Sequence, residues 1–184
     1  RGTVQLFAFG SHDALEVVAN DPGRGTIDLG SSVGFHRLVV PWTTTFGAWK
    51  SRLAPSYGYD QVGFDTGQLR GNGGAHVLSL REDLQREVAK GLRVGVGFDG
   101  EMRFDNVDFR VPIPPLRRTY GRTERPIEEV ARSLNNTATA IYAEALWDVT
   151  SRLRIIPGVR LDWYHWSRTE RLSFDPRLVG RWQR

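Results

Sequence analysis

The sequence of 184 residues contains no cysteine and very little lysine. The absence of cysteine excludes a disulfide scaffold, a thiolate metal site and a cysteine nucleophile together, and it suits a protein of the cell envelope. Lys50 and Lys90 are the only lysines, so arginine supplies the other 23 of the 25 basic side chains. Because these arginines are interleaved with 21 acidic residues along the whole chain and form no basic face or run, the sequence predicts no nucleic-acid partner.

Long apolar runs are also missing. The longest, Leu38–Trp42, has the length of a strand, and the mean hydropathy is −0.39. A membrane-spanning helix needs roughly 18 apolar residues, so a helical membrane protein is excluded. The content of 40% apolar and 25% charged residues excludes a collagen, an extended coiled coil and a wholly disordered tail. A membrane β-barrel stays open, because its strands distribute their apolar residues by alternation.

Motifs for catalysis or cofactor binding are absent from the sequence: there is no GxSxG, P-loop, GxGxxG or HExxH pattern. No histidine has a second histidine or a carboxylate at helical metal-ligand spacing; the four are His12, His36, His76 and His165. His12 and Asp13 are interpreted as a solvated turn pair, with a ligand loop as the alternative. Glu128 and Glu129 would point apart on a helix, which makes a poor catalytic pair. We therefore expect no enzyme, no catalytic residue, no cofactor and no metal site, and the ligand-binding residues are not identified.

What the sequence has in abundance is alternation with period two, the period of a strand. In Leu92–Phe104, all the apolar side chains share one face, and Gly100 is the only position on that face without a side chain. Gly95 and Gly97 join the charged residues on the other face. The alternation flips after Asp105, which predicts a strand end or a bulge there.

A second alternating segment is Leu153–Trp163, although Pro157 is unusual in a central strand. On its polar side, Arg160 and Asp162, like the neighbouring Arg154, either contact an anionic ligand or form ion-pair ladders. Weaker extended segments bring the total to about eight strands: Thr3–Gly10, Val33–Trp42, Trp49–Tyr59, Ala75–Gln85, Thr137–Trp147 and Phe174–Trp182.

The connections between these segments alternate in length. Short ones are expected at Thr43–Ala48, Glu87–Lys90 and Val149–Ser151, and long ones at Ser11–Ser32, Phe64–Gly74, Asp105–Asn136 and Trp166–Ser173. An up-and-down barrel in an outer membrane has this asymmetry, with short periplasmic turns and long external loops. Within the longest connection, helical spacing predicts a short helix from Pro126 through Ile127, Val130, Ala131 and Leu134.

Strand lengths agree with a membrane. Trp49 and Tyr59 lie on one face ten residues apart, as do Leu153 and Trp163, and a tilted strand of ten residues rises roughly 25 Å, the height of the apolar band of outer-membrane barrels. Aromatic residues at both strand ends predict two interfacial belts: Trp42, Trp49 and Trp147 beside short turns, and Tyr57, Tyr59, Trp163 and Tyr164 toward long loops.

The segment Thr139–Arg184 resembles the barrel of TonB-dependent outer-membrane receptors. The residues that carry the resemblance are Ile141–Trp147, a short turn at Asp148–Arg152, then Ile156–Tyr164 and, after a loop, Phe174–Leu178. The resemblance implies a barrel of about 22 strands, of which residues 1–184 would form roughly a third as one partial domain without the plug. It further implies outer-membrane localisation, contact with lipid and with the remainder of the barrel and plug, coupling to an energy-transducing inner-membrane complex, and uptake of an iron chelate, a corrinoid or an oligosaccharide.

The fold class expected is thus all-β, an antiparallel up-and-down transmembrane β-barrel segment. Because the chain starts at Arg1 and ends within a strand pattern at Arg184, both ends are interpreted as cuts. Two alternatives stay open: a small, complete eight-stranded barrel with a structural role, and a soluble carbohydrate-binding β-sandwich.

Overall fold

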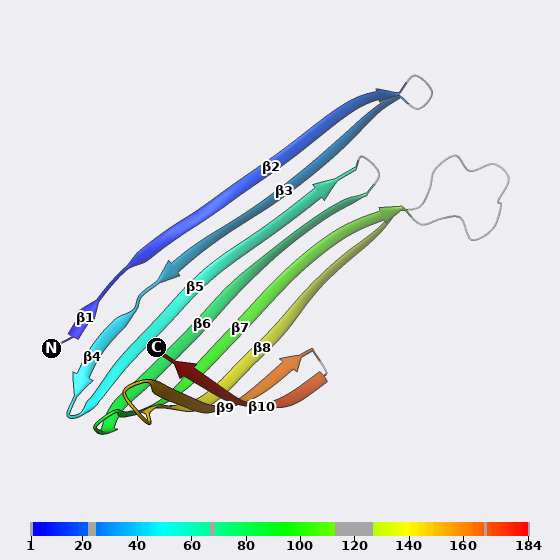
Figure 1. Ribbon diagram of the computed structural model, residues 1–184. Coiled ribbons are helices and arrows are strands. Elements are labelled where there is room, and N and C mark those ends of the chain that lie inside the picture. The colour runs from blue at the N-terminus through cyan, green and yellow to red at the C-terminus, as the bar shows by residue number, and fades with distance from the viewer. Residues whose placement is uncertain (1, 22–24, 67–68, 113–126, 168, 184) are drawn as a thin grey trace.

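A computed structural model describes residues 2–21, 25–66, 69–112, 127–167 and 169–183. These residues form ten strands of one antiparallel sheet (Figure 1): β1 Gly2–Val4, β2 Phe7–Asp21, β3 Gly25–Val39, β4 Trp42–Phe46, β5 Trp49–Asp65, β6 Arg70–Ala89, β7 Leu92–Pro112, β8 Ile127–Asp148, β9 Leu153–Trp166 and β10 Thr169–Trp182. No membrane-crossing helix occurs among the described residues.

The strands follow one another up and down. β5 to β10 pair in chain order, β3 pairs with β2 and with the upper part of β5, and the short β4 pairs with the lower part of β5 and with β1. β3 and β4 are separated at Val40 and Pro41, where proline has no amide to donate to a ladder. Gln5 N–H donates to the Pro41 carbonyl across this break at 2.9 Å. With β1/β2 and β3/β4 each counted as one interrupted strand, the expectation of about eight strands is confirmed.

The three short turns are confirmed, but the first two are tighter than predicted, because Thr43–Phe46 belongs to β4 and Glu87–Ala89 to β6. Gly47 and Gly91 have φ of 58° and 76°, the left-handed region that tight hairpins require, and they close the β4–β5 and β6–β7 turns. The β8–β9 turn is held by Thr150, whose hydroxyl oxygen accepts from the Leu153 amide at 2.9 Å.

The long connections are mostly strand, which corrects their predicted extents. The segment predicted as a connection over Ser11–Ser32 belongs largely to β2 and β3, and β7 continues past Asp105 to Pro112. No bulge follows Asp105, because its partner is Leu134 and the next residues pair in step. The strands are longer than the roughly 9–11 residues needed to cross the hydrocarbon layer of a membrane. Outside that layer both faces of a strand can meet water, so the alternation of apolar residues ends before the strand does.

The described part of the segment predicted as a helix is a strand, so that prediction is wrong. Ile127, Val130, Ala131 and Leu134 lie in β8 and pair with β7, while Pro126 falls outside the described residues. A full ladder with a neighbouring strand outweighs the weak local preference for a helix.

Pro157 lies inside β9, between β8 and β10. The β8–β9 pairing passes from Glu144↔Gly158 to Trp147↔Ile155, which leaves a gap opposite the proline that has no N–H to contribute. The register is the same on both sides of the gap, so one missing donor interrupts the ladder without shifting it.

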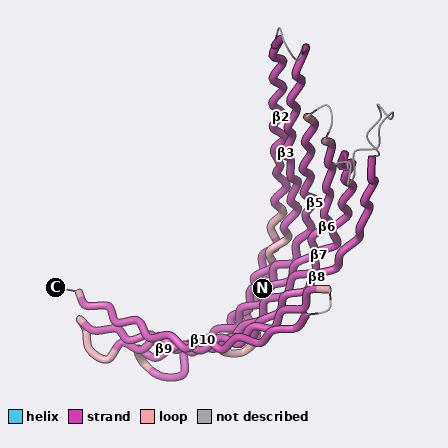
Figure 2. The backbone as a smooth tube through the Cα atoms, turned by 90° about the vertical axis from the view of Figure 1, so that its right-hand side faces the viewer, coloured by secondary structure: helices cyan, strands magenta, loops and turns pink. Residues whose placement is uncertain are grey.

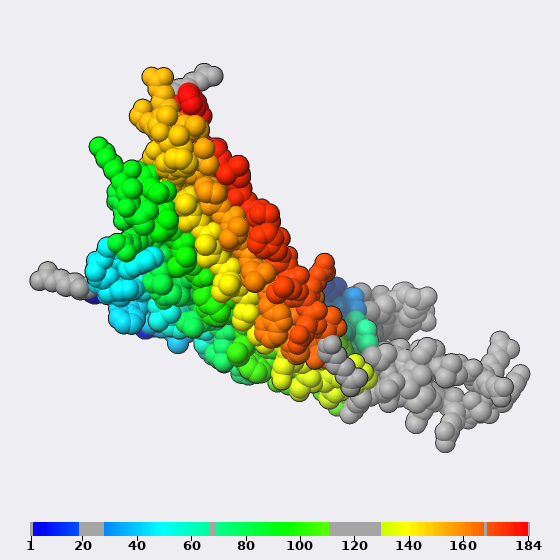
Figure 3. Space-filling model, turned by 90° about the horizontal axis from the view of Figure 1, so that it is seen from below, coloured from blue at the N-terminus to red at the C-terminus, as the bar shows by residue number. Residues whose placement is uncertain are grey.

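The sheet is a single curved layer without a core of its own. Figure 2 shows β9 and β10 turned far from the direction of β2 and β3, and on the face seen in Figure 3 the strands from β4 to β10 lie edge to edge with no other described segment over them. Only Ala75, Val77 and Ala140 are buried hydrophobic residues among those described. A domain normally needs two packed layers to bury its apolar surface, so a second layer for this sheet has to come from its surroundings.

Candidate functional site

From β5 to β10, the strand register sorts the side chains onto two chemically opposite faces of the sheet. In β2 and β3 the sorting does not hold, because Phe9 and Phe35 lie on the same face as Arg37 and Asp60. One of the two faces, here called the apolar face, carries row after row of hydrophobic residues, such as Leu84–Val96–Ala143–Val159–Pro176 and Phe98–Ile141–Leu161–Phe174. Many of these side chains are exposed to a degree unusual for a water-soluble protein: Ile141 is 58% and Phe174 63% exposed. An apolar surface of this extent requires an apolar neighbour.

A carboxylate of β6, Glu82, interrupts the rows of hydrophobic residues on the apolar face. Glu82 lies in the row of Phe98 and Ile141, and the Ser51 hydroxyl donates to its Oε1 at 2.6 Å. Ser51 itself is only 7% exposed. The Glu82 carboxylate thus has a hydrogen-bond partner among apolar side chains, which offsets the cost of placing a polar group there.

The other face, here called the charged face, carries two networks of paired charges. In the upper one, Arg103 joins two carboxylates: its Nη1 donates to Asp60 at 2.9 Å and its Nε to Asp105 at 2.8 Å. Arg37 also pairs with Asp60, and Asn136 donates to Asp105 at 3.0 Å. The network therefore links β3, β5, β7 and β8.

The lower network is built around a tyrosine ring. Arg81 and Arg160 each place their guanidinium 5.6 Å from the centroid of Tyr142. Both also contact Asp99, at 3.5 and 3.1 Å, and the Tyr142 hydroxyl donates to a further carboxylate, Asp83.

At the end of this network, Arg160 Nε donates at 2.9 Å to Asp162, a carboxylate residue only 5% exposed. Nearby, Arg177 pairs with Glu144. For Arg160 and Asp162, the structure therefore shows the ion-pair ladder, one of the two roles that the sequence left open. Arg154 is separate from it: it forms a two-bond pair with Asp148 at the β8–β9 turn, at 2.6 and 3.1 Å.

The charged face is the concave one, since its side chains reach across intervening strands. Arg103 of β7 contacts Asp60 of β5 over β6, and Tyr142 of β8 contacts Asp83 of β6 over Gly97 of β7. A Cβ on Gly97 would lie 2.2 Å from the Tyr142 ring. Gly97, on the charged side of β7 as the alternation predicted, therefore makes room for this ring.

The aromatic belts are confirmed with one correction. Trp42, Trp49 and Trp147 lie on the apolar face at the short-turn end, and Tyr57, Tyr59 and Trp163 lie on it toward the long loops. Tyr164 does not join them: it pairs with Ala138 and Arg171 on the charged face.

The histidines lie apart from both networks. His12 bonds Gln61 at 3.0 Å, His76 bonds Tyr57 at 2.8 Å, and His165 faces Glu170 at 3.3 Å. In the part of the chain that the structure describes, no three His, Asp or Glu side chains group as metal ligands. Sequence reasoning did not identify Asp60, Asp83, Asp99 or Arg103 as partners, because alternation assigns a face but not the register that joins strands.

A curved single sheet with an apolar convex face, aromatic belts and a paired-charge concave face is the wall of a transmembrane β-barrel. Comparison with known families agrees: residues 7–183 match the family described as "TonB dependent receptor-like, beta-barrel". The chain therefore belongs to the TonB-dependent receptor β-barrel family, which confirms both the expected fold class and the resemblance. No match was found among the curated proteins.

Solved structures of this kind share the fold at low sequence identity. The outer membrane transporter YddB from Escherichia coli aligns with a TM-score of 0.68 and 11% identity, over 99% of this chain and 27% of its own length. The copper transporter OprC aligns at 0.60 and 11%, over 96% and 34%. The ferric yersiniabactin uptake receptor FyuA from Yersinia pestis aligns at 0.55 and 14%, over 96% and 31%. The chain thus spans about a third or less of the proteins it matches.

Proposed function

We propose that this chain forms part of the barrel wall of an outer-membrane receptor that imports a scarce ligand by energy-coupled transport. The observation that carries the proposal is the opposite chemistry of the two faces. The convex face exposes Ile141, Phe174 and their neighbours as a lipid-facing surface would, and the concave face presents paired charges as the wall of a wet lumen would.

The edges of the sheet support a partial barrel of residues 1–184 rather than a complete one. Among the described residues, β10 pairs only with β9, and β2 only with β3. A closed eight-stranded barrel would require these two edges to pair with each other, and a β-sandwich would require a second sheet. The exposed ladder edges are instead suited to further strands of the same barrel, with a plug domain inside it and an energy-transducing inner-membrane complex below.

The paired charges define what the wall can contribute to transport. Each arginine of the two networks is neutralised by carboxylates at hydrogen-bond distance, so the wall offers polar surface without a strong net field that would trap a ligand. In this proposal the wall takes part by binding and enclosure, and we assign it neither covalent chemistry nor a cofactor. The ligand class we propose is an iron chelate, a corrinoid or an oligosaccharide; FyuA, a structural neighbour, is named for uptake of a ferric chelate.

The test is an uptake experiment with the full-length receptor that carries this chain. Bacteria with and without the gene are given labelled ferric chelates, cobalamin and oligosaccharides, before and after the proton-motive force is collapsed. We expect gene-dependent, energy-dependent uptake of one of these classes and recovery of the receptor in the outer-membrane fraction. Recovery in a soluble fraction, or uptake that survives collapse of the proton-motive force, would refute the proposal.

A further inference from the structure

Positive charge is in excess at the short-turn end of the wall. Figure 1 shows the β4–β5, β6–β7 and β8–β9 turns together at one end of the sheet. Just above these turns, one row crosses the strands as Lys50–Gln85–Gly95–Glu144–Gly158–Arg177. This row and the residues between it and the turns are here called the short-turn rim: residues 45–50, 85–95, 144–158 and 177–183. Its cations are Lys50, Arg86, Lys90, Arg93, Arg152, Arg154, Arg177 and Arg181, and its carboxylates are Glu87, Glu144 and Asp148.

Few of these cations are neutralised by a carboxylate. Arg154 pairs with Asp148, and Arg177 pairs with Glu144. In the part of the chain that the structure describes, no other cation of the rim forms an ion pair, although Arg93 also acts on Asp148 through its charge. The remaining six are all exposed: Lys50, Arg86, Lys90, Arg93, Arg152 and Arg181. The rim therefore keeps a net positive charge, unlike the two networks higher on the wall.

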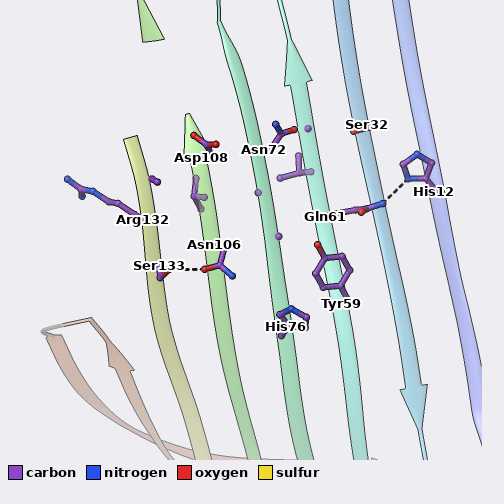
Figure 4. Close-up of a pocket in the computed structure, with 16 residues that line it drawn as sticks. His12, Ser32, Tyr59, Gln61, Asn72, His76, Asn106, Asp108, Arg132 and Ser133 are labelled. Carbon is purple, nitrogen blue, oxygen red and sulfur yellow. Dashed lines mark hydrogen bonds between the residues drawn. The ribbon is translucent and has the colours of Figure 1, made fainter. Parts of the chain in front are cut away.

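The long-loop end of the apolar face has a different chemistry. Figure 4 shows a depression of about 570 Å³ at that end, lined by side chains of β2 to β8. Most of these side chains are neutral amides, hydroxyls and imidazoles, and among the described lining residues only Asp108 and Arg132 carry a full charge at neutral pH. The excess of positive charge is thus a local property of the short-turn rim.

A belt of tryptophans indicates the depth of the rim in the membrane. Trp49, Trp147 and Trp182 lie on the apolar face of the rim, and interfacial tryptophans lie at the level of lipid headgroups. Arg86 lies opposite Trp49 in the same row, with its guanidinium carbon 5.9 Å from the centroid of the ring, which is a cation–π distance. Lys90 follows in the β6–β7 turn. The lipid-facing side of the rim therefore presents cations at the depth where lipid phosphates lie.

The cations of the charged face contribute through their field. Lys50, Arg93 and Arg181 project from that face, but each lies close to a turn or a strand end. Charges act over a Debye length, about 8 Å at physiological ionic strength, so these three raise the potential at the neighbouring headgroups as well. A basic side chain near a membrane surface favours an anionic lipid roughly fivefold.

We infer that the short-turn rim selects anionic phospholipid headgroups over zwitterionic ones in the leaflet that surrounds it. The cations follow the wall past three turns to the end of β10, and a leaflet is an acidic partner that surrounds a wall along its perimeter at one height. An acidic protein would instead favour a compact patch. The inference rests on the proposed function, because insertion in the outer membrane with the short turns in the periplasm brings this rim to a phospholipid leaflet. It adds a lipid preference that is separate from the imported ligand.

The test uses the full-length receptor that carries this chain, in vesicles of phosphatidylethanolamine mixed with phosphatidylglycerol. Val88, which lies between Arg86 and Lys90 and is 48% exposed, is replaced by Val88→Cys and labelled with a fluorophore. Any cysteine elsewhere in the receptor is replaced first, and this chain has none. Quenching by nitroxide-labelled phosphatidylglycerol or phosphatidylethanolamine then reports which lipid gathers at the rim. We expect severalfold stronger association of phosphatidylglycerol, and loss of this preference at about 1 M salt, where the Debye length is roughly 3 Å.

Variants test which side chains are responsible. The double variant Arg86→Gln, Lys90→Gln should reduce the preference for phosphatidylglycerol at least threefold. The matched control is Arg70→Gln, which removes an arginine from the same face of β6 at the long-loop end, where Asp65 already pairs with it, and it should leave the preference unchanged. Thermal unfolding of each variant verifies that it is folded.

The inference is overturned if both lipids quench equally in the unsubstituted receptor, or if the preference survives in the folded double variant or at high salt. An equal loss in Arg70→Gln would overturn it too, because the rim would then have no special part. Equal quenching together with an acidic protein that binds the rim in detergent would make the rim a protein site instead. Energy-dependent uptake is measured in parallel: its absence from the unsubstituted receptor refutes the proposed function, whereas uptake without any lipid preference refutes this inference alone.

Discussion

The assignment of faces predicts opposite outcomes for the same substitution at two valines of neighbouring strands. Val159 of β9 lies on the apolar face and is 46% exposed; Val179 of β10 lies on the charged face and is 40% exposed. Val159→Arg and Val179→Arg therefore change identical side chains of similar exposure. The arginine projects from opposite faces in the two variants, and Val179, which pairs with Ile156, lies three residues nearer the short turn.

The expected magnitude follows from depth. Val159 stands about six residues from Leu153 and about four from Trp163 along β9, which at about 2.5 Å of rise per residue places it roughly 15 Å and 10 Å from the two ends of the apolar band. An arginine near the midplane on the lipid side of a barrel costs about 2–4 kcal/mol, roughly 30- to 900-fold in the folding equilibrium. On the wet charged face, where Glu144 lies close by in the Arg177 pair, the cost should stay below about 1 kcal/mol.

The assay is equilibrium unfolding by urea of the full-length receptor in lipid vesicles, followed by tryptophan fluorescence. We expect Val159→Arg to lower the free energy of unfolding by about 3 kcal/mol and Val179→Arg to change it little. Equal losses in the two variants, or the larger loss at Val179, would show that the apolar face does not contact lipid.

Further predictions concern the charged face and the short turns. Gly97→Ala should cost about 1–3 kcal/mol in the same unfolding assay, because its Cβ would lie 2.2 Å from the Tyr142 ring, whereas Gly180→Ala, with open space around it, should be neutral; a neutral Gly97→Ala would contradict the placement of the ring. Arg154 holds the pKa of Asp148 below its usual 3.8 by a hydrogen bond and by its charge, so the stabilisation is complete above that usual value and is lost as pH falls through the lowered pKa. Arg154→Gln should return the Asp148 pKa toward 3.8 in an NMR titration, and an unchanged titration would exclude the pair in solution.

The sequence predicted the faces of the membrane-spanning strands because one face must meet hydrocarbon there. In Leu92–Phe104 and Leu153–Trp163, every apolar residue named on the apolar side is found there. Beyond Asp105 that requirement ends, and the same reasoning produced a loop and a helix where β7 and β8 continue as a ladder. Where both faces of a strand meet water, the side-chain pattern says little about whether the segment pairs with a neighbouring strand. Backbone hydrogen bonds can hold such a pair together without a particular side-chain pattern.

The networks of the charged face depend on a second kind of information, the register between strands. Alternation places Arg81, Asp99 and Arg160 on polar faces of their own strands, but only the pairings Arg81↔Asp99 and Tyr142↔Arg160 bring them into one network. A one-residue slip of β7 would turn Asp99 toward lipid and remove a carboxylate that both arginines share. Moving a charged carboxylate to the apolar face costs free energy, so this slip is disfavoured. The paired charges therefore favour the same strand register that aligns the apolar rows, and the two faces of the sheet support one register together.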